Sequence, residues 1–329
     1  MQIRPGVVAL LVALSVAAAN AKYPLRKPHR GFQSKVPAFT IQPSEDWEAC
    51  IFGHLSNRNP VDVTGFELHM PEGAHHFVLW KYDGDPAKAP TEWKLNPGCT
   101  GLSGDGSLVP NNLFGMQTPN GRVRLPAGVA VRLEAHQPVL FNPHMKNFGP
   151  DAVTPDVRFN VIPAKKGSVK HYAESLTVGN TDAIHIPAAS KFKIALDWVL
   201  PDDLYIVEFS THQHSLGTRT SVDLLDQPGG TVQRNIITND SWDHAVEWWP
   251  QEPELFRKGQ VIRTTCEWNN PRDHEVAFGV ETTDEMCFLT GYMYKADATK
   301  PLPACEHCLC VRPEQGLLCF SPAITAETF

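Results

Sequence analysis

The sequence predicts an all-β protein with two tandem antiparallel β-sandwich domains and a cysteine-rich C-terminal tail. From about residue 46 onward, short apolar runs are separated by Pro, Gly, Asn and Asp, which is the spacing of strands and turns in β-sandwiches. A chain of 329 residues has room for about two domains of ordinary size. A break at 163–167 divides the apolar runs into two series, so we expect one sandwich from each series.

The N-terminal segment carries the features of an export signal. It has an Arg near its start, an apolar run over 7–19 and a small-x-small cleavage site that ends at Ala21. The basic, proline-containing residues that follow lack periodicity, so we expect a flexible arm there. The predicted segments are a signal peptide (1–21), a flexible basic arm (22–45), an N-terminal β-sandwich domain (46–163), a C-terminal β-sandwich domain (164–295) and a Cys-rich tail (296–329).

Composition limits the class of partner. The formal net charge of −7 is spread along the chain without a basic stripe, which argues against a nucleic acid as partner. No later segment approaches the roughly 20 apolar residues of a membrane span. We therefore expect a secreted or periplasmic protein that acts on a small-molecule or peptide substrate.

Export places the eight cysteines in an oxidising compartment, where disulfides are the default expectation. Only Cys266 and Cys287 lie in the second sandwich, which makes them a natural pair. The pairing of Cys50 and Cys99 stays open. The tail could form a two-disulfide knot or bind zinc or Cu(I) as thiolates, and export favours the knot; its cysteines are Cys305, Cys308, Cys310 and Cys319.

A candidate metal clamp lies in the second half of the chain. His212 and His214 follow a strand-like run, and residues two apart in an extended segment point to the same face. Met286 is a candidate third ligand, because a thioether with two imidazoles favours copper, Cu(I) above all, over harder metals. The alternative is a polar surface pair of histidines and a core methionine.

A second group of histidines lies in the first half. His75 and His76 are adjacent at the entrance of a predicted strand, so they can share a metal only where the backbone departs from the pleat, which Gly73 would allow. His136 is the predicted third ligand, and His144 is a weaker alternative. The competing interpretation is one buried and one solvated histidine.

Five segments occur in the order of a known family. They are the His75-His76 pair, Leu133 to His136, Thr211 to His214 with Gly217, Gly259 to Cys266, and Glu285 to Cys287. Taken together they resemble the copper type II ascorbate-dependent monooxygenases, the family of peptidylglycine α-hydroxylating monooxygenase and dopamine β-monooxygenase.

The resemblance implies two jelly-roll-like sandwiches that face each other across an open cleft, with two coppers per chain. His75, His76 and His136 would hold an electron-storing copper. His212, His214 and Met286 would be catalytic and hold the copper that uses O2. The family also implies a disulfide between Cys266 and Cys287, and ascorbate or another one-electron donor as co-substrate. Glu134 and Gln213 are candidates for orienting the imidazoles.

The chain departs from the peptide-amidating members where they grip substrate. Ser210 stands where they have an Arg, and Thr290 where they have a Tyr, so we expect a substrate other than a C-terminal glycine peptide. Arg219 is a possible substitute. The predicted function is a secreted copper monooxygenase that hydroxylates a C–H bond of an unknown small substrate. The alternatives are a copper-binding protein of the same fold without turnover and a β-sandwich recognition module with structural histidines.

Overall fold

All regular secondary structure in the described part of the chain is β-strand, which confirms the predicted fold class. The structure is a computed structural model. It describes residues 25–71, 74–82, 94–97, 111–118, 120–243, 245–279, 283–299, 309–311, 316–320 and 323–329. In these ranges no helix has the length and apolarity that a membrane crossing needs. The predicted signal peptide, Cys99, Cys305 and Cys308 lie outside the described residues.

The first half of the chain forms two facing sheets. Its strands are β1 (Phe32–Lys35), β2 (Asp46–His54), β3 (Val61–His69), β4 (Ala74–Lys81), β5 (Lys94–Pro97), β6 (Asn111–Met116), β7 (Asn120–Arg124), β8 (Val129–Leu133), β9 (Pro138–Lys146), β10 (Arg158–Pro163) and β11 (His171–Tyr172). One sheet has the order β1-β10-β3-β8-β11, with β7 also paired to β3, and the other has the order β5-β2-β9-β4-β6.

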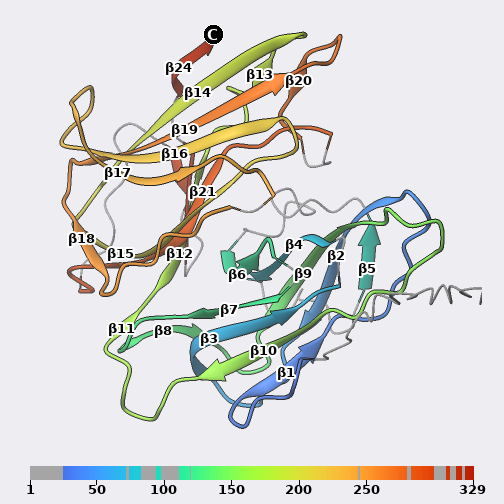
Figure 1. The fold of residues 1–329 in the computed structure, drawn as a ribbon. Coiled ribbons are helices and arrows are strands. Elements are labelled where there is room, and N and C mark those ends of the chain that lie inside the picture. Colours follow the sequence, from blue (N-terminus) through green and yellow to red (C-terminus); the bar gives the residue numbers. More distant parts are fainter. Residues whose placement is uncertain are drawn as a thin grey trace, which may run out of the picture.

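The second half repeats this layered plan. Its strands are β12 (Glu174–Gly179), β13 (His185–Ile186), β14 (Ser190–Val199), β15 (Leu204–His212), β16 (Gly217–Leu225), β17 (Val232–Asn239), β18 (Glu254–Phe256), β19 (Val261–Asn270), β20 (Val276–Ala277), β21 (Phe288–Lys295), β22 (Leu309–Val311), β23 (Gly316–Phe320) and β24 (Ala323–Thr328). The larger sheets have the orders β18-β15-β21-β12-β23-β22 and β17-β16-β19-β14-β24. Figure 1 shows the two halves as separate lobes.

Alternation of apolar and polar residues explains why these segments become strands. In β19, residues at every second position from Ile262 to Trp268 are buried, and the intervening side chains are more exposed. The first half buries a cluster of phenylalanines around Phe77, Phe141 and Phe159, while Trp198 and Phe209 belong to the core of the second half. Each half therefore has its own hydrophobic core.

The two halves are also joined by a buried interface. Val207, Tyr292 and Tyr294 come from strands of the second half but belong to the core cluster of the first half. The hydroxyl of Tyr292 donates a hydrogen bond of 2.7 Å to the carbonyl of Leu113 on β6. This interface brings one face of β15 and β21 against β4 and β6, and the site described below lies there.

Several segments differ from the sequence-based expectation. Residues 32–35, predicted to lie in a flexible arm, form β1 and pair with β10, and Ile41 bridges Val153. The tail also contributes strands, since β23 runs parallel to β12 and β24 pairs with β14. Strand pairing with distant partners gives these segments their structure, and such pairing has no local signature in sequence.

Candidate metal centre and adjoining cavity

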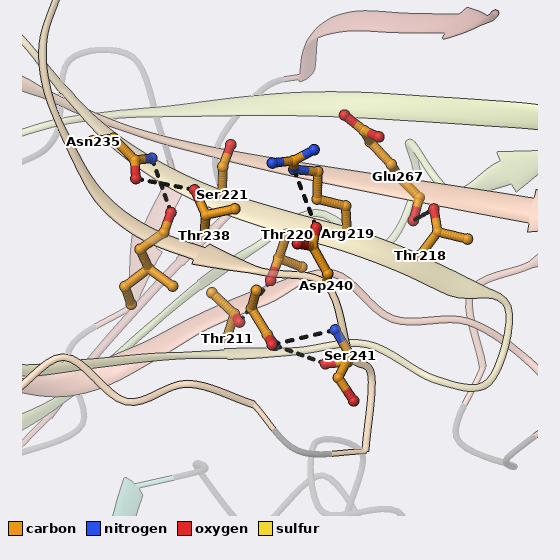
Figure 2. Close-up of polar contacts among 12 residues, drawn as sticks. Thr211, Thr218, Arg219, Thr220, Ser221, Asn235, Thr238, Asp240, Ser241 and Glu267 are labelled. Carbon is orange, nitrogen blue, oxygen red and sulfur yellow. Dashed lines mark hydrogen bonds and ion pairs between the residues drawn. The ribbon is translucent and has the colours of Figure 1, made fainter.

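The His-x-His segment lies where β15 ends. Because strand side chains alternate, Glu208, Ser210 and His212 share the face of β15 that meets the first half. Thr211 points the other way, and its hydroxyl hydrogen-bonds the hydroxyl of Thr220 on β16 at 2.8 Å, as Figure 2 shows. This contact fixes the end of the strand and so the direction of His212.

Hydrogen bonds to one ring nitrogen orient both of these histidines. Nδ1 of His212 donates to Oε1 of Gln117 at 2.8 Å, and Gln117 also donates from Nε2 to the carbonyl of Thr211 at 3.3 Å. Nδ1 of His214 lies 3.2 Å from the carbonyl of Asp284. In each ring the other nitrogen, Nε2, is therefore the one that could coordinate a metal.

Met286 is held in place from both sides. On one side, the carboxylate of Glu285 accepts hydrogen bonds from the backbone N–H groups of His214 at 3.0 Å and Leu216 at 2.6 Å. It also accepts one from the indole N–H of Trp268 at 2.8 Å. On the other side, Cys287 forms a disulfide with Cys266 on β19. Both neighbours thus tie Met286 to the His-x-His turn and to the core.

Burial of Glu285 is complete, and it raises the pKa of this carboxyl group to about 7 in spite of four donors that favour the ionised form, the fourth being the backbone N–H of Met286. The sequence analysis quoted Glu285 within a motif but gave it no role. Its place directly beside a candidate ligand is the signal that could have identified it.

The first half supplies three histidines to the same place. His76 on β4 lies directly opposite His144 on β9, and the register shifts between Ala74 and His76. This irregularity lets the adjacent His75 and His76 reach one site, as a departure from the pleat was predicted to do. Nε2 of His144 lies 2.9 Å from Oδ1 of Asp46, which leaves Nδ1 of His144 as its potential ligand atom.

The histidines of both halves form one continuous cluster. The ring centre of His75 lies 5.1 Å from those of His76 and His144, 5.8 Å from that of His212 and 5.9 Å from that of His214. Two triads have ligand atoms that all lie within 4.8 Å of one another, namely His75, His76 and His144, and His75, His212 and His214. His75 belongs to both triads.

The cluster is chemically suited to a metal. Within the described residues, Nε2 of His75, Nδ1 of His76 and Nδ1 of His144 are buried and have no hydrogen-bond partner. Burial, with a further contribution from the neighbouring imidazoles, lowers the pKa of His75 to about 3. The same causes lower the pKa values of His76 and His212 well below the ordinary range. A neutral imidazole whose ring nitrogen has no hydrogen-bond partner can use the lone pair of that nitrogen to coordinate a metal.

The donor set is that of copper rather than of a hard cation. Imidazoles suit copper in both oxidation states, and the thioether of Met286, which lines the same cavity as His76 and His212, favours Cu(I). The residues present therefore fit copper.

The structure does not bring His136 into the cluster. His136 is exposed, has a φ of 51°, and donates from its backbone N–H to the carbonyl of Asn57 in the turn after β8. His144, the weaker alternative in the sequence analysis, takes the third position because β9 pairs with β4 and places it opposite His76. The sequence analysis did not recognise β9 as a strand, and Pro138 and Pro143 within it explain why.

The predicted orienting residues are also different. Glu134 is exposed, and Gln213 donates to the carbonyl of Glu267 at 3.2 Å rather than to an imidazole. The groups that contact the imidazoles are instead Asp46, Gln117 and the carbonyl of Asp284. Gln117 comes from the opposite half, so only the docking of the halves reveals it.

A cavity of about 140 Å³ extends from the metal cluster along the interface. Its two walls are sheet faces, and alternate residues of paired strands line them. Glu208, Ser210 and His212 lie on β15 opposite Tyr292, Thr290 and Phe288 on β21, and His76, Val78 and Trp80 lie on β4. The candidate metal ligands His76 and His212 therefore lie at one end of the cavity. The other end is formed by Trp80, Glu208 and Tyr292, each four residues away along its strand from the residue at the metal end.

Arg219 does not line this cavity. Its Nε lies 3.4 Å from Oδ1 of Asp240 on the outer surface of β16, as Figure 2 shows. Ser210 and Thr290, where the resemblance places substrate-gripping residues, do line the cavity. Within the lining there is therefore no arginine that could bind a carboxylate.

The fold and the site define a β-sandwich protein with a histidine and methionine metal centre between two lobes. Comparison with known families agrees with this class. Residues 178–315 match the family model of the copper type II ascorbate-dependent monooxygenase, C-terminal domain. These residues contain His212, His214 and Met286, so the second half of the chain carries a C-terminal domain of that family.

Other comparisons add little. No curated protein matches the chain. Among solved structures, PNGase F, a glycosylasparaginase from Flavobacterium meningosepticum, aligns with 83% of this chain and 98% of its own at 11% identity and a TM-score of 0.37. The infectious bursal disease virus Gx strain structure aligns with 80% of this chain and 70% of its own at 10% identity and a TM-score of 0.19. Likenesses of this size carry no argument about function.

Proposed function

We propose that this protein is a copper monooxygenase that hydroxylates a C–H bond of a small substrate with O2 and a one-electron donor such as ascorbate. The observation that carries the proposal is the meeting of five imidazoles and Met286 at one end of an interface cavity. The match of residues 178–315 to the family supports the same chemistry.

The six donors divide into two sets of three without sharing. His75, His76 and His144 would hold one copper, and His212, His214 and Met286 would hold a second. When bound, copper supplies one-electron transfers and activation of O2. The chain's own residues orient the donors: Gln117 and Asp46 hold the outer nitrogens of His212 and His144, while Glu285 fixes the segment that carries Met286.

The reaction balances as R–H + O2 + 2 electrons + 2 protons giving R–OH + H2O. Two one-electron donors supply the electrons, a C–H bond breaks, and one oxygen atom is reduced to water. The protein's contribution is a partly enclosed cavity with apolar walls, including Val78, Met116 and Phe288, that would hold the reacting carbon beside His212 and Met286. Exclusion of bulk water would limit side reactions there.

The decisive assay is ascorbate-dependent oxygen uptake by the copper-loaded full chain across a panel of small aromatics, amines and peptides. We expect at least one substrate to stimulate uptake and to yield one hydroxylated product per O2. Met286→Ala should abolish the stimulation, whereas His136→Ala should leave it intact. If no compound stimulates uptake and Met286→Ala changes nothing, the enzyme proposal fails, and tight copper binding in the same preparation would then favour a copper-binding protein without turnover.

We also propose that the protein is exported. The apolar run over 7–19 and the cleavage pattern at Ala21 support this, as does the disulfide between Cys266 and Cys287, because disulfides persist in oxidising compartments. N-terminal sequencing of the protein recovered from the medium or periplasm should begin after Ala21; an intact N-terminus in the cytosolic fraction would refute export.

A further inference from the structure

The cavity ends, away from the histidines, in a buried acid. Glu208 is 5% exposed and lines the cavity, and within the described residues its carboxyl group has no hydrogen-bond or ion-pair partner. A buried charge without a partner is costly, and native proteins retain one where a function needs it. Burial raises the pKa of Glu208 well above its usual range, and the nearby Glu247 raises it further.

A second acid stands at the same end. Glu247 is exposed, lines the cavity, and accepts a hydrogen bond of 2.9 Å from the indole N–H of Trp249. Glu208 pairs with Tyr292 across β15 and β21, and Phe209 forms an antiparallel bridge with Trp248, so Glu208, Tyr292 and Glu247 lie close together. No basic side chain is among the groups that shift the pKa of Glu208, so no cation among the described residues offsets the two acids.

The first half completes this end of the cavity with two more polar atoms. Tyr292 bonds the carbonyl of Leu113, whose neighbour Asn112 pairs with Trp80 across β6 and β4. Oδ1 of Asn112 and Nε1 of Trp80 are buried, line the cavity and have no hydrogen-bond partner among the described residues. Acceptors on Glu208, Glu247 and Asn112 thus surround this end of the cavity, and the indole N–H of Trp80 is a donor there without a partner among the described residues.

We propose that Glu208 and Glu247 form a subsite for an organic cation, such as a protonated amine, which anchors the substrate at the end of the cavity opposite the histidines. This proposal rests on the proposed function, because it names the class of substrate that the same cavity would take. A cation would neutralise the two acids and satisfy the free acceptor of Asn112, whereas an anion would be repelled. Glu208 and Glu247 belong to none of the metal-binding groups found among the described residues, which favours an organic cation over a metal ion.

The strand geometry also fixes where on the substrate oxidation occurs. Glu208 and His212 are four residues apart on a regular part of β15, so their Cα atoms are separated by about 13 Å. A molecule anchored at Glu208 therefore presents to the metal end a carbon several bonds away from its charge. Oxidation at the carbon next to the ammonium group, or one further, is outside this reach.

The test measures binding separately from turnover. Isothermal titration of the metal-free full chain with n-hexylammonium and with the neutral hexan-1-ol should show the cation binding at least about tenfold more tightly. Glu208→Gln should abolish this preference and leave hexanol affinity within about twofold, and Glu247→Gln should reduce the preference in the same direction. The matched control is Glu252→Gln, an exposed acid of the same connecting segment, which should change neither affinity.

Equal binding of the two compounds, or an unchanged preference in both Glu208→Gln and Glu247→Gln, would overturn the subsite. Oxygen uptake by the copper-loaded chain then separates this failure from failure of the proposed function. If neutral and cationic compounds stimulate oxygen uptake equally, the proposed cation subsite is wrong and the proposed monooxygenase function is supported. If cations bind tightly in a Glu208-dependent way but no compound stimulates oxygen uptake, the cation subsite is supported and the proposal of monooxygenase activity is wrong. Stimulation by ethylammonium as strong as by n-hexylammonium would contradict the length argument.

Discussion

Gln117, from the first half of the chain, accepts a hydrogen bond of 2.8 Å from Nδ1 of His212, from the second half. The same amide donates to the carbonyl of Thr211, so one side chain fixes both the ring and the backbone at the end of β15. A ligand of one lobe is thereby oriented by the other lobe, and docking of the lobes and shape of the metal centre are coupled.

Gln117→Ala should therefore weaken copper binding without removing a ligand. We expect the affinity for Cu(I) to fall about 10- to 100-fold, the usual effect of losing a group that orients a metal-bound histidine. Competition with a Cu(I) chelator measures this. Gln260→Ala removes a partly exposed glutamine that accepts a hydrogen bond from the backbone N–H of Arg257, and it should leave the affinity unchanged. Equal affinities for Gln117→Ala and the parent would show that the contact is incidental.

His144→Ala and His136→Ala distinguish the two candidate third ligands of the first half. His144 is 2% exposed and lies among the other imidazoles, whereas His136 is exposed in a turn. We expect His144→Ala to lower the copper content by one metal per chain after desalting, and His136→Ala to leave it unchanged. Elemental analysis against protein concentration gives the answer, and the opposite pattern would restore His136 as the ligand.

Replacing both Cys266 and Cys287 by serine should destabilise the protein and loosen Met286. A disulfide that closes a loop of this size, with a sequence separation of 21, contributes about 3 kcal/mol to the free energy of unfolding. Urea unfolding measures that loss. X-ray absorption of the Cu(I)-loaded variant should show a weaker sulfur contribution than the parent, because one of the two supports of Met286 is gone. A full sulfur signal would assign the positioning to Glu285 alone.

Glu208→Gln should change the pH dependence of stability. Burial raises the pKa of Glu208 in the folded chain above that of the unfolded chain, so the folded state binds the extra proton. The stability that this group contributes is present below the unfolded pKa and is lost as pH rises toward the folded pKa. Glutamine mimics the protonated acid. The free energy of unfolding of the variant should match that of the parent near pH 4.5 and exceed it at pH 7.5.

Urea unfolding of the ligand-free protein at both pH values tests this expectation. Glu252→Gln, in an exposed position, should follow the parent at both. An advantage of Glu208→Gln that is the same at pH 4.5 and 7.5 would mean that packing of the amide, rather than loss of a titrating group, causes the change.

Local pattern was enough to predict the class of fold and part of the site. Period-two alternation predicted strands such as β3, β15 and β19, and residue chemistry predicted the roles of His212 and Met286 as soft-metal donors. The adjacency of His75 and His76 implied an irregular backbone, and the register of β4 shifts there. These inferences depend only on neighbours in sequence or on side-chain type.

The remaining features depend on contacts between distant segments. His144 could be preferred over His136 only through the pairing of β9 with β4, and prolines within β9 conceal that strand. The role of Gln117 requires the docking of the two halves, since it contacts His212 from the opposite half. Sequence alone expected two separate metal clusters across an open cleft; the structure brings five imidazoles into one group at a packed interface.

The membership of His75 in both triads bears on any substitution of Met286. With Met286 present, six donors serve two metals, three each. Removing the thioether leaves five donors, and the nearest replacement for His212 and His214 is an imidazole that the other metal already uses. A Met286 variant would thus exchange sulfur for nitrogen at one metal and strip a ligand from its neighbour. The spectrum of the copper-loaded variant would then show two copper ions competing for the imidazole of His75, rather than the loss of one ligand from one copper.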